Sequence, residues 1–316
     1  MSEFEALLTN EIQPWLKEHV QDGWITSEDG LKLHYYQAVN PNEKAAVVMI
    51  HGFCEFFGKY HETAYRFYKE GYSVFFLELR GHGKSQRERQ YEDERVYVSS
   101  FEDYVEDIHS FMSYVREYSL SKRYFLFAHS MGGTAAALYM EKYPQDFTCA
   151  VLSSPMLKVN YGKIPDAAVD VLAVYTKIHD QDDEYAPGQH AFTGKDEFDK
   201  SSCLDYVRYM YQLNQRRKDH DYQTWGATWG WARAAKSGSE KALRNANKIK
   251  TPVLLCQAGK DTMVRLEGQN IFDQNCPTVT LIQFPESKHE LFNADQETRD
   301  KYFESVLAYF KAYAKK

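Results

Sequence analysis

The sequence predicts an α/β protein with a mostly parallel, doubly wound sheet and an inserted, mainly helical cap. Short apolar runs, typical of strands buried on both faces, alternate with segments of helical periodicity. This alternation stops at Pro155 and resumes only after a long polar and aromatic stretch. We therefore predict a core formed by residues 1–155 and 236–316, interrupted by a cap at residues 156–235.

The strands are predicted from apolar runs that are rich in β-branched and aromatic residues. Before the cap they cover residues 31–37, 45–50, 72–77, 124–127 and 149–153. After the cap they cover residues 253–257 and 279–284.

Helices are predicted where apolar residues recur three and four positions apart. They cover residues 4–16, 60–70 and 98–115, the segment from residue 131 onward, and residues 302–313. Pro14 is expected to kink or restart the first of them. The polar face of that first helix is mainly acidic, so we expect it to dock onto the protein's own core; the alternative is a membrane-surface helix.

The composition excludes several classes of protein. The net charge of −7 argues against nucleic acid as a partner. The five cysteines are odd in number and scattered, without a CxxC pair, which predicts a reduced, cytoplasmic protein with no disulfide framework and no zinc knuckle. We expect no signal peptide, because the first twenty residues carry Glu3, Glu5 and Glu11 and no apolar stretch. Every apolar run is too short to span a bilayer.

The strongest chemical signal lies in residues 125–133, with the sequence FLFAHSMGG. An apolar strand leads to a serine between small residues and then to a helix start, which is the order of a nucleophile elbow. The sharp turn strains Ser130 and leaves no room for side chains two positions to either side, where Ala128 and Gly132 stand. Ala128 replaces the more usual glycine. The alternative interpretation of Ser130 is a simple helix cap.

Two further residues complete a catalytic triad in the chain order serine, acid, histidine. Asp261 follows the strand at residues 253–257, and His289 follows the strand that ends at residue 284. In this interpretation Ser130 attacks a carbonyl carbon and His289 takes its proton. Asp261 then orients the imidazole and stabilises its charged form.

The tetrahedral oxyanion of such a reaction needs backbone donors placed in advance. The residue after the nucleophile, Met131, supplies one N–H, and the loop after an early strand supplies the other. His51-Gly52-Phe53 occupies that loop, so we predict Phe53 N–H as the second donor and His51 as a brace of the loop.

We expect no cofactor and no metal ion. Residues 83–85, Gly-Lys-Ser, resemble the end of a phosphate-binding loop, but Glu78 stands where the first glycine is required. His289-Glu290 resembles the start of a zinc-protease motif, but Asn293 occupies the place of its second histidine.

Several short motifs together resemble one branch of a known superfamily. They are HGFCEFFGKY at residues 51–60, RGHGKS at 80–85, AHSMGG at 128–133, GKD at 259–261 and HELFN at 289–293. On these residues the chain resembles the monoacylglycerol lipase and bacterial lysophospholipase branch of the α/β-hydrolases, over residues 45–310 but poorly in the cap. Glu78, where aspartate is usual, and Ala128 depart from the family pattern.

The resemblance implies an α/β-hydrolase fold and a metal-free serine hydrolase that cleaves small-molecule lipid esters, monoacylglycerols or lysophospholipids, through an acyl-enzyme. It also implies transient, peripheral contact with membranes or micelles. The oligomeric state is left open. For the acyl entrance we predict Cys54, because it lies beside Phe53, and a set of cap aromatics whose alternative role is packing of the cap. These aromatics are Tyr161, Tyr175, Trp225, Trp229 and Trp231.

Two other functions stay open. One is a peptidase of the same fold, similar to a proline iminopeptidase, or a hydrolase of small non-lipid esters. An aminopeptidase needs acidic cap residues to bind a free amine, and the acidic cluster at residues 180–184 offers them, although its density suggests a solvated loop. The other is a non-catalytic binding protein, against which the intact triad argues.

Overall fold

The computed structural model describes residues 2–91, 93–162 and 165–315 of the chain. Its centre is a sheet with the strand order β1-β2-β4-β3-β5-β6-β7-β8. β2 runs antiparallel to β1 and β4, and the remaining neighbours are parallel, so the predicted α/β class is confirmed. The strands are β1 (Gln21–Thr26), β2 (Lys32–Ala38), β3 (Ala46–Ile50), β4 (Ser73–Leu77), β5 (Tyr124–His129), β6 (Cys149–Ser153), β7 (Val253–Ala258) and β8 (Val279–Phe284).

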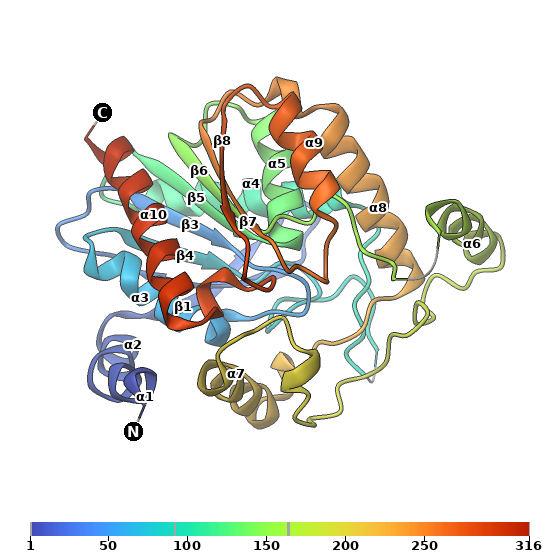
Figure 1. Cartoon of the computed structure of the whole chain (residues 1–316), viewed down its shortest axis with the longest axis horizontal. Coiled ribbons are helices and arrows are strands. Elements are labelled where there is room, and N and C mark those ends of the chain that lie inside the picture. The colour runs from blue at the N-terminus through green and yellow to red at the C-terminus, as the bar shows by residue number, and fades with distance from the viewer. Residues whose placement is uncertain (1, 92, 163–164, 316) are drawn as a thin grey trace.

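Helices follow most of the strands and cover both faces of the sheet (Figure 1). They are α1 (Glu3–Leu7), α2 (Gln13–His19), α3 (His61–Lys69), α4 (Phe101–Tyr118), α5 (Met131–Lys142), α6 (Asp166–Ile178), α7 (Tyr206–Lys218), α8 (Trp229–Arg244), α9 (Leu266–Asn275) and α10 (Gln296–Ala314). Short 3-10 segments lie at Phe57–Tyr60, Phe198–Lys200, His220–Tyr222, Ala246–Lys248 and Leu291–Asn293.

The core is divided into two layers by the sheet. Successive residues of a strand point to opposite faces, and in β3 Val48 packs toward α4, α5 and α8 while Val47 packs toward α3 and α10. Both residues are fully buried. A strand buried on both faces requires a continuous apolar run, which is why the sequence of β3 does not alternate.

The N-terminal helix docks onto the protein itself, as its acidic polar face predicts. Phe4 and Trp15 are buried, the first against Tyr211 and the second against Tyr65. A π-helical turn, Leu8–Ile12, joins α1 to α2, and Pro14 lies in the first turn of α2.

The predicted cap segment leaves the sheet after β6 and carries α6 and α7, which lie outside the two helical layers in Figure 1. Its expected end at residue 235 falls inside α8. That helix begins at Trp229 and continues into the core, where a Cβ at Gly238 would lie 2.7 Å from Phe101. Among the described residues, no helix combines the length and the hydropathy that crossing a bilayer requires.

Candidate active site

Ser130 stands at the sharp turn between β5 and α5. Its backbone, with φ 52° and ψ −118°, has a conformation that non-glycine residues adopt only under constraint. A Cβ at Gly132 would lie 2.5 Å from the carbonyl oxygen of His51 and 2.7 Å from that of Ile50, so α5 can start this close to β3 only with glycine there. Ala128 is fully buried and pairs with Ile50 in the sheet. The predicted turn is therefore present, with alanine at its first small position.

The structure brings Ser130, His289 and Asp261 into one chain of hydrogen bonds. His289 Nε2 lies 2.8 Å from Ser130 Oγ, and its Nδ1 lies 2.6 Å from Asp261 Oδ2. The other carboxylate oxygen of Asp261 accepts the N–H groups of Met263 and Val264 at 2.8 and 3.1 Å. These donors hold the fully buried carboxylate as an acceptor, so the imidazole proton belongs on Nδ1 and the lone pair of Nε2 faces the serine hydroxyl.

The two backbone donors predicted for an oxyanion lie in the loop after β3, at Phe53, and at the start of α5, at Met131. His51 Nδ1 donates to the carbonyl oxygen of Gly52 at 2.7 Å, while its Nε2 accepts the N–H of Leu79 at 3.0 Å. Burial lowers the pKa of His51, which keeps the ring neutral for both roles. The Gly52 carbonyl and the Phe53 N–H belong to one planar peptide, so this brace also fixes the direction of Phe53 N–H. Met131 begins α5, where an N–H has no intrahelical acceptor.

A pocket of about 390 Å³ opens onto Ser130 and His289. Part of its wall is apolar and part is charged. The apolar residues are Phe53, Cys54, Phe192, Leu213, Trp225 and Met263. The charged residues deepest in the protein are Glu55, Lys59, Arg216 and Glu290.

Comparison with known proteins assigns the chain to a family. The sequence pattern of the family described as serine aminopeptidase, S33, matches residues 41–297. The chain belongs to this S33 family. It is a serine hydrolase with the α/β-hydrolase fold.

Relatives extend over nearly the whole S33 chain. A Haemophilus influenzae protein named probable lysophospholipase L2 is 26% identical over 308 residues, which cover 94% of each chain. The monoacylglycerol lipase of Mycolicibacterium smegmatis is 26% identical and covers 80% of this chain and 84% of its own. The crystal structure of Paleococcus ferrophilus monoacylglycerol lipase superposes with a TM-score of 0.69 at 21% identity, covering 89% of this chain and 99% of that one.

The predicted pocket residues are placed in different surroundings in this S33 enzyme. Cys54 and Trp225 line the pocket. Burial raises the pKa of the Cys54 thiol to about 12. The thiol therefore stays protonated at neutral pH, so Cys54 is part of the pocket wall and not a nucleophile. Within the described residues, the other four predicted aromatics do not line it. Tyr161 is half-buried, Tyr175 is exposed on α6, Trp229 lines a second cavity between α6 and α8, and Trp231 packs against Phe53 with ring centroids 4.1 Å apart.

A buried ionic cluster that the sequence motifs did not predict borders Ser130 and His289. Lys59 Nζ lies 2.5 Å from Glu55 and 2.7 Å from Glu290, and all three side chains are nearly inaccessible to solvent. Glu55 also accepts the Gly52 N–H at 2.6 Å. This hydrogen bond connects the cluster to residues 51–54, which are called the oxyanion loop below. Burial alone would raise the pKa of Glu55, but the charge of Lys59 lowers it below the ordinary value. The spacing of four between Glu55 and Lys59 was the available signal.

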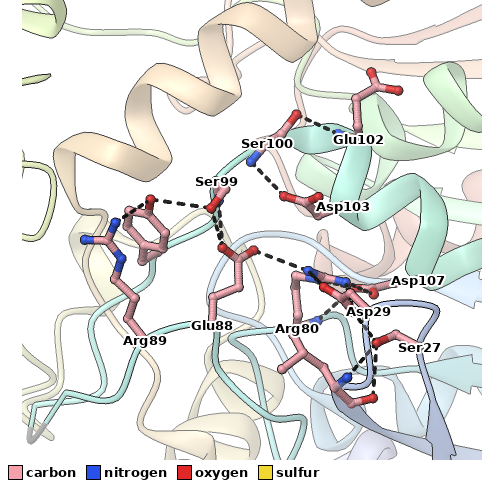
Figure 2. Close-up of polar contacts among 12 residues, drawn as sticks. Ser27, Asp29, Arg80, Glu88, Arg89, Ser99, Ser100, Glu102, Asp103 and Asp107 are labelled. Carbon is pink, nitrogen blue, oxygen red and sulfur yellow. Dashed lines mark hydrogen bonds and ion pairs between the residues drawn. The ribbon is translucent and has the colours of Figure 1, made fainter.

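A second ionic cluster is centred on Arg80 (Figure 2). The guanidinium bridges the buried Asp107, at 2.6 Å, and the exposed Asp29, at 2.8 Å. This fixes the start of the turn that carries His82, whose ring lies 6.1 Å from that of Phe53. No group of three or more histidine, cysteine or acidic side chains among the described residues is arranged to hold a metal ion.

Proposed function

We propose that this S33 enzyme cleaves esters of single-chain lipids, monoacylglycerols or lysophospholipids, through an acyl-enzyme on Ser130. One observation carries the proposal: the hydrogen-bonded chain of Ser130, His289 and Asp261 opens into a pocket whose wall contains both apolar and polar side chains. A single-chain lipid ester needs both kinds of contact, because an apolar acyl chain lies on one side of its carbonyl and a polar alcohol on the other.

The chemistry follows from the tautomer of His289. Nε2 accepts the proton of Ser130 as the hydroxyl attacks the ester carbonyl, and the imidazolium then gives that proton to the leaving alcohol. Asp261, held by the Met263 N–H, stabilises the imidazolium without itself taking the proton. Water repeats the sequence on the acyl-enzyme and releases the fatty acid.

The N–H groups of Phe53 and Met131 stabilise the tetrahedral oxyanion in this proposal. Removing one such donor from a serine hydrolase typically costs about 10²–10³ in rate. The brace from His51 to the Gly52 carbonyl supports this role, because it prevents rotation of the peptide that carries the Phe53 N–H.

The walls of the pocket support an orientation for the substrate. Phe192, Leu213 and Trp225 offer apolar surface for an acyl chain. Polar side chains of the lining, among them Thr193 and Gln212, offer hydrogen-bonding groups to a glycerol or phosphoglycerol leaving group.

A peptidase is the alternative function, because the family is described as a serine aminopeptidase family. The acidic cluster at residues 180–184 lies outside the described pocket lining, and two of its members are engaged elsewhere. Asp182 pairs with Arg233, and Asp183 pairs with Arg89. Three carboxylates line the described pocket, but Glu55 and Glu290 are bridged by Lys59 and Glu197 pairs with Lys200, so each of them is already engaged by a lysine. The ester function is therefore favoured.

The test is a substrate panel with the purified enzyme. It contains a monoacylglycerol, a lysophospholipid, a triacylglycerol, alanyl and prolyl amides, and p-nitrophenyl esters of four and eight carbons below their critical micelle concentrations. Four extra methylenes at about 0.8 kcal/mol each set an upper limit of about two hundredfold in kcat/KM, and we expect at least about tenfold. Ser130→Ala is the control. A flat chain-length series, or amides cleaved faster than esters, would favour the peptidase.

We also propose that the enzyme works in a reducing, cytoplasmic compartment and touches membranes or micelles only transiently. All five cysteines are buried and they are scattered along the chain, which suits a reducing environment. The cap helix α6 exposes Val171, Val174, Tyr175 and Ile178, which suits brief contact with an apolar surface.

A further inference from the structure

The oxyanion loop contains a strained residue directly after Phe53. Cys54 has φ 56°, in the left-handed region that residues with a Cβ rarely adopt. Such a conformation persists only when neighbouring contacts hold it, and such residues concentrate at functional sites. If Cys54 relaxed to negative φ, the chain on both sides of it would turn, including the peptide that carries the Phe53 N–H.

Two parts of the molecule hold this loop. From the core, Glu55 accepts the Gly52 N–H and His51 donates to the Gly52 carbonyl. From the cap, Arg216 in α7 donates through Nη2 to the Cys54 carbonyl at 2.5 Å. The core contacts fix the peptides before Phe53, whereas Arg216 fixes the carbonyl of the strained residue itself.

The surroundings of Arg216 are unusual for an arginine. Its side chain is buried, and among the described residues no carboxylate oxygen lies within 4.0 Å of it. Its Nη1 donates instead to the carbonyls of Tyr222 and Thr224, and its guanidinium lies over the ring of Trp225. Burial lowers the pKa of Arg216 to about 10, which still leaves it charged at neutral pH. Burying a cation without an ion-pair partner costs free energy, and the hydrogen bonds that Arg216 donates to carbonyls offset this cost.

Arg208, two turns earlier on α7, gives the contrast. It forms an ordinary ion pair with Glu62 of α3 at 2.7 Å and anchors the start of the helix to the core. The docking of α7 thus already has a conventional anchor, and Arg216 adds a contact to the oxyanion loop.

We propose that Arg216 is a positioning residue that holds the strained Cys54 peptide and thereby keeps the Phe53 N–H aligned, so that the cap helps to assemble the oxyanion hole. The inference rests on the oxyanion role proposed for Phe53, but not on which ester is the natural substrate.

The test therefore uses p-nitrophenyl butyrate, which reports serine-hydrolase turnover whatever the lipid specificity. For Arg216→Gln we expect kcat to fall by about ten- to a hundredfold, with KM changed less than about threefold, because the loss concerns the transition state. Arg216→Lys should recover part of this, since an ammonium can still donate to one carbonyl. The affinity for a trifluoromethyl ketone, which forms an oxyanion on the serine, should weaken in parallel.

The decisive readout is rescue at Cys54. Glycine adopts positive φ without steric cost, whereas alanine has the same difficulty as cysteine. In the Arg216→Gln background, Cys54→Gly should therefore restore kcat by about fivefold and Cys54→Ala should not. Both substitutions remove the thiol, so they form a matched pair. In an Arg208→Gln background, where the loop contact is intact, Cys54→Gly should give no rescue.

Active-site titration with a fluorophosphonate and the melting temperature of each variant keep folding separate from alignment. Equal effects of Cys54→Gly and Cys54→Ala, or rescue of Arg208→Gln, would overturn the proposal. So would failure of both Arg216 variants to fold, because Arg216 would then serve the stability of the cap. Loss of lipid activity in the substrate panel, with the Arg216 and Cys54 results unchanged, would refute the lipid specificity alone.

Discussion

At the scale of single residues, Asp261 determines which nitrogen of His289 faces Ser130. Its carboxylate can only accept from His289 Nδ1, because its other oxygen already takes two backbone N–H groups. Asparagine in its place would donate to Nδ1 and leave the proton on Nε2, where it blocks transfer from the serine. We therefore expect Asp261→Asn to lower kcat by about 10⁴ while the fold is kept, as measured by p-nitrophenyl ester hydrolysis.

The matched control for this prediction is Glu286→Gln. Glu286 is another acidic residue that follows β7 in the sequence, but its side chain is exposed and pairs with Lys260. Its removal should leave kcat within about twofold, since an exposed ion pair contributes little. A small effect of Asp261→Asn together with a large effect of Glu286→Gln would show that the acid had been wrongly assigned.

His129, the neighbour of Ser130, should make the protein sensitive to acid. Burial lowers the pKa of His129 from 6.5 to about 4. The unfolded chain therefore binds a proton there below pH 6.5, whereas the folded chain does so only below about 4. The stability contributed by neutral His129 is fully present above pH 6.5 and is lost as the pH falls toward 4, by at most about 3 kcal/mol.

The measurement is the free energy of unfolding in urea between pH 7.5 and 4.5. His129→Gln should flatten the curve over this range relative to the parent protein. His220→Gln, which changes a histidine whose side chain is 64% exposed, should leave the curve parallel to the parent. If the His129 variant also ran parallel, its burial could not be the source of the acid sensitivity.

At the scale of elements, α6 presents an unusual face for a soluble helix. Val171, Val174 and Ile178 are 69%, 59% and 72% exposed, and they recur at helical spacing. Contact with a lipid surface would bury this face and bring the cap close to aggregated substrate. We expect Val174→Glu combined with Ile178→Glu to reduce hydrolysis of micellar monoacylglycerol by about fivefold or more, through about 1–2 kcal/mol of lost burial.

Activity on a monomeric p-nitrophenyl ester should stay within about twofold in the same double variant, because the triad is untouched. Leu120→Glu is the matched control, since Leu120 is 63% exposed but lies outside the cap, between α4 and β5. It should change neither activity. A loss on monomeric and micellar substrates alike would mean that α6 supports the pocket rather than the lipid contact.

At the scale of the whole molecule, strands that contain an apolar run were predictable, and a strand without one was not. β3 is apolar throughout, and so is β4 apart from Ser73, because both strands are buried on both faces, so their sequences identify them directly. β1 was missed, since this exposed edge strand contains Gly23 and polar residues and is defined only by pairing with β2. The meeting of Ser130, Asp261 and His289 followed from their order after parallel strands.

Contacts between side chains that are far apart in the sequence could not be predicted from the sequence. Trp231 was predicted to line the pocket, yet it packs against Phe53, because α8 begins at Trp229, inside the predicted cap, and continues into the core. Arg216 is 162 positions from Cys54, and neither periodicity nor spacing connects them. Lys59 and Glu290 meet only when the loop after β3 is brought beside the loop after β8.

The central claim is that Ser130 forms the acyl-enzyme, and covalent labelling tests it most directly. The enzyme is treated with a long-chain alkyl fluorophosphonate, and the intact mass and the modified peptide are determined by mass spectrometry. One adduct should form, on the peptide that contains Ser130. The adduct should be absent from Ser130→Ala and form far more slowly in His289→Ala. An adduct on another residue, or an unlabelled Ser130 in a preparation that turns over ester, would contradict the account.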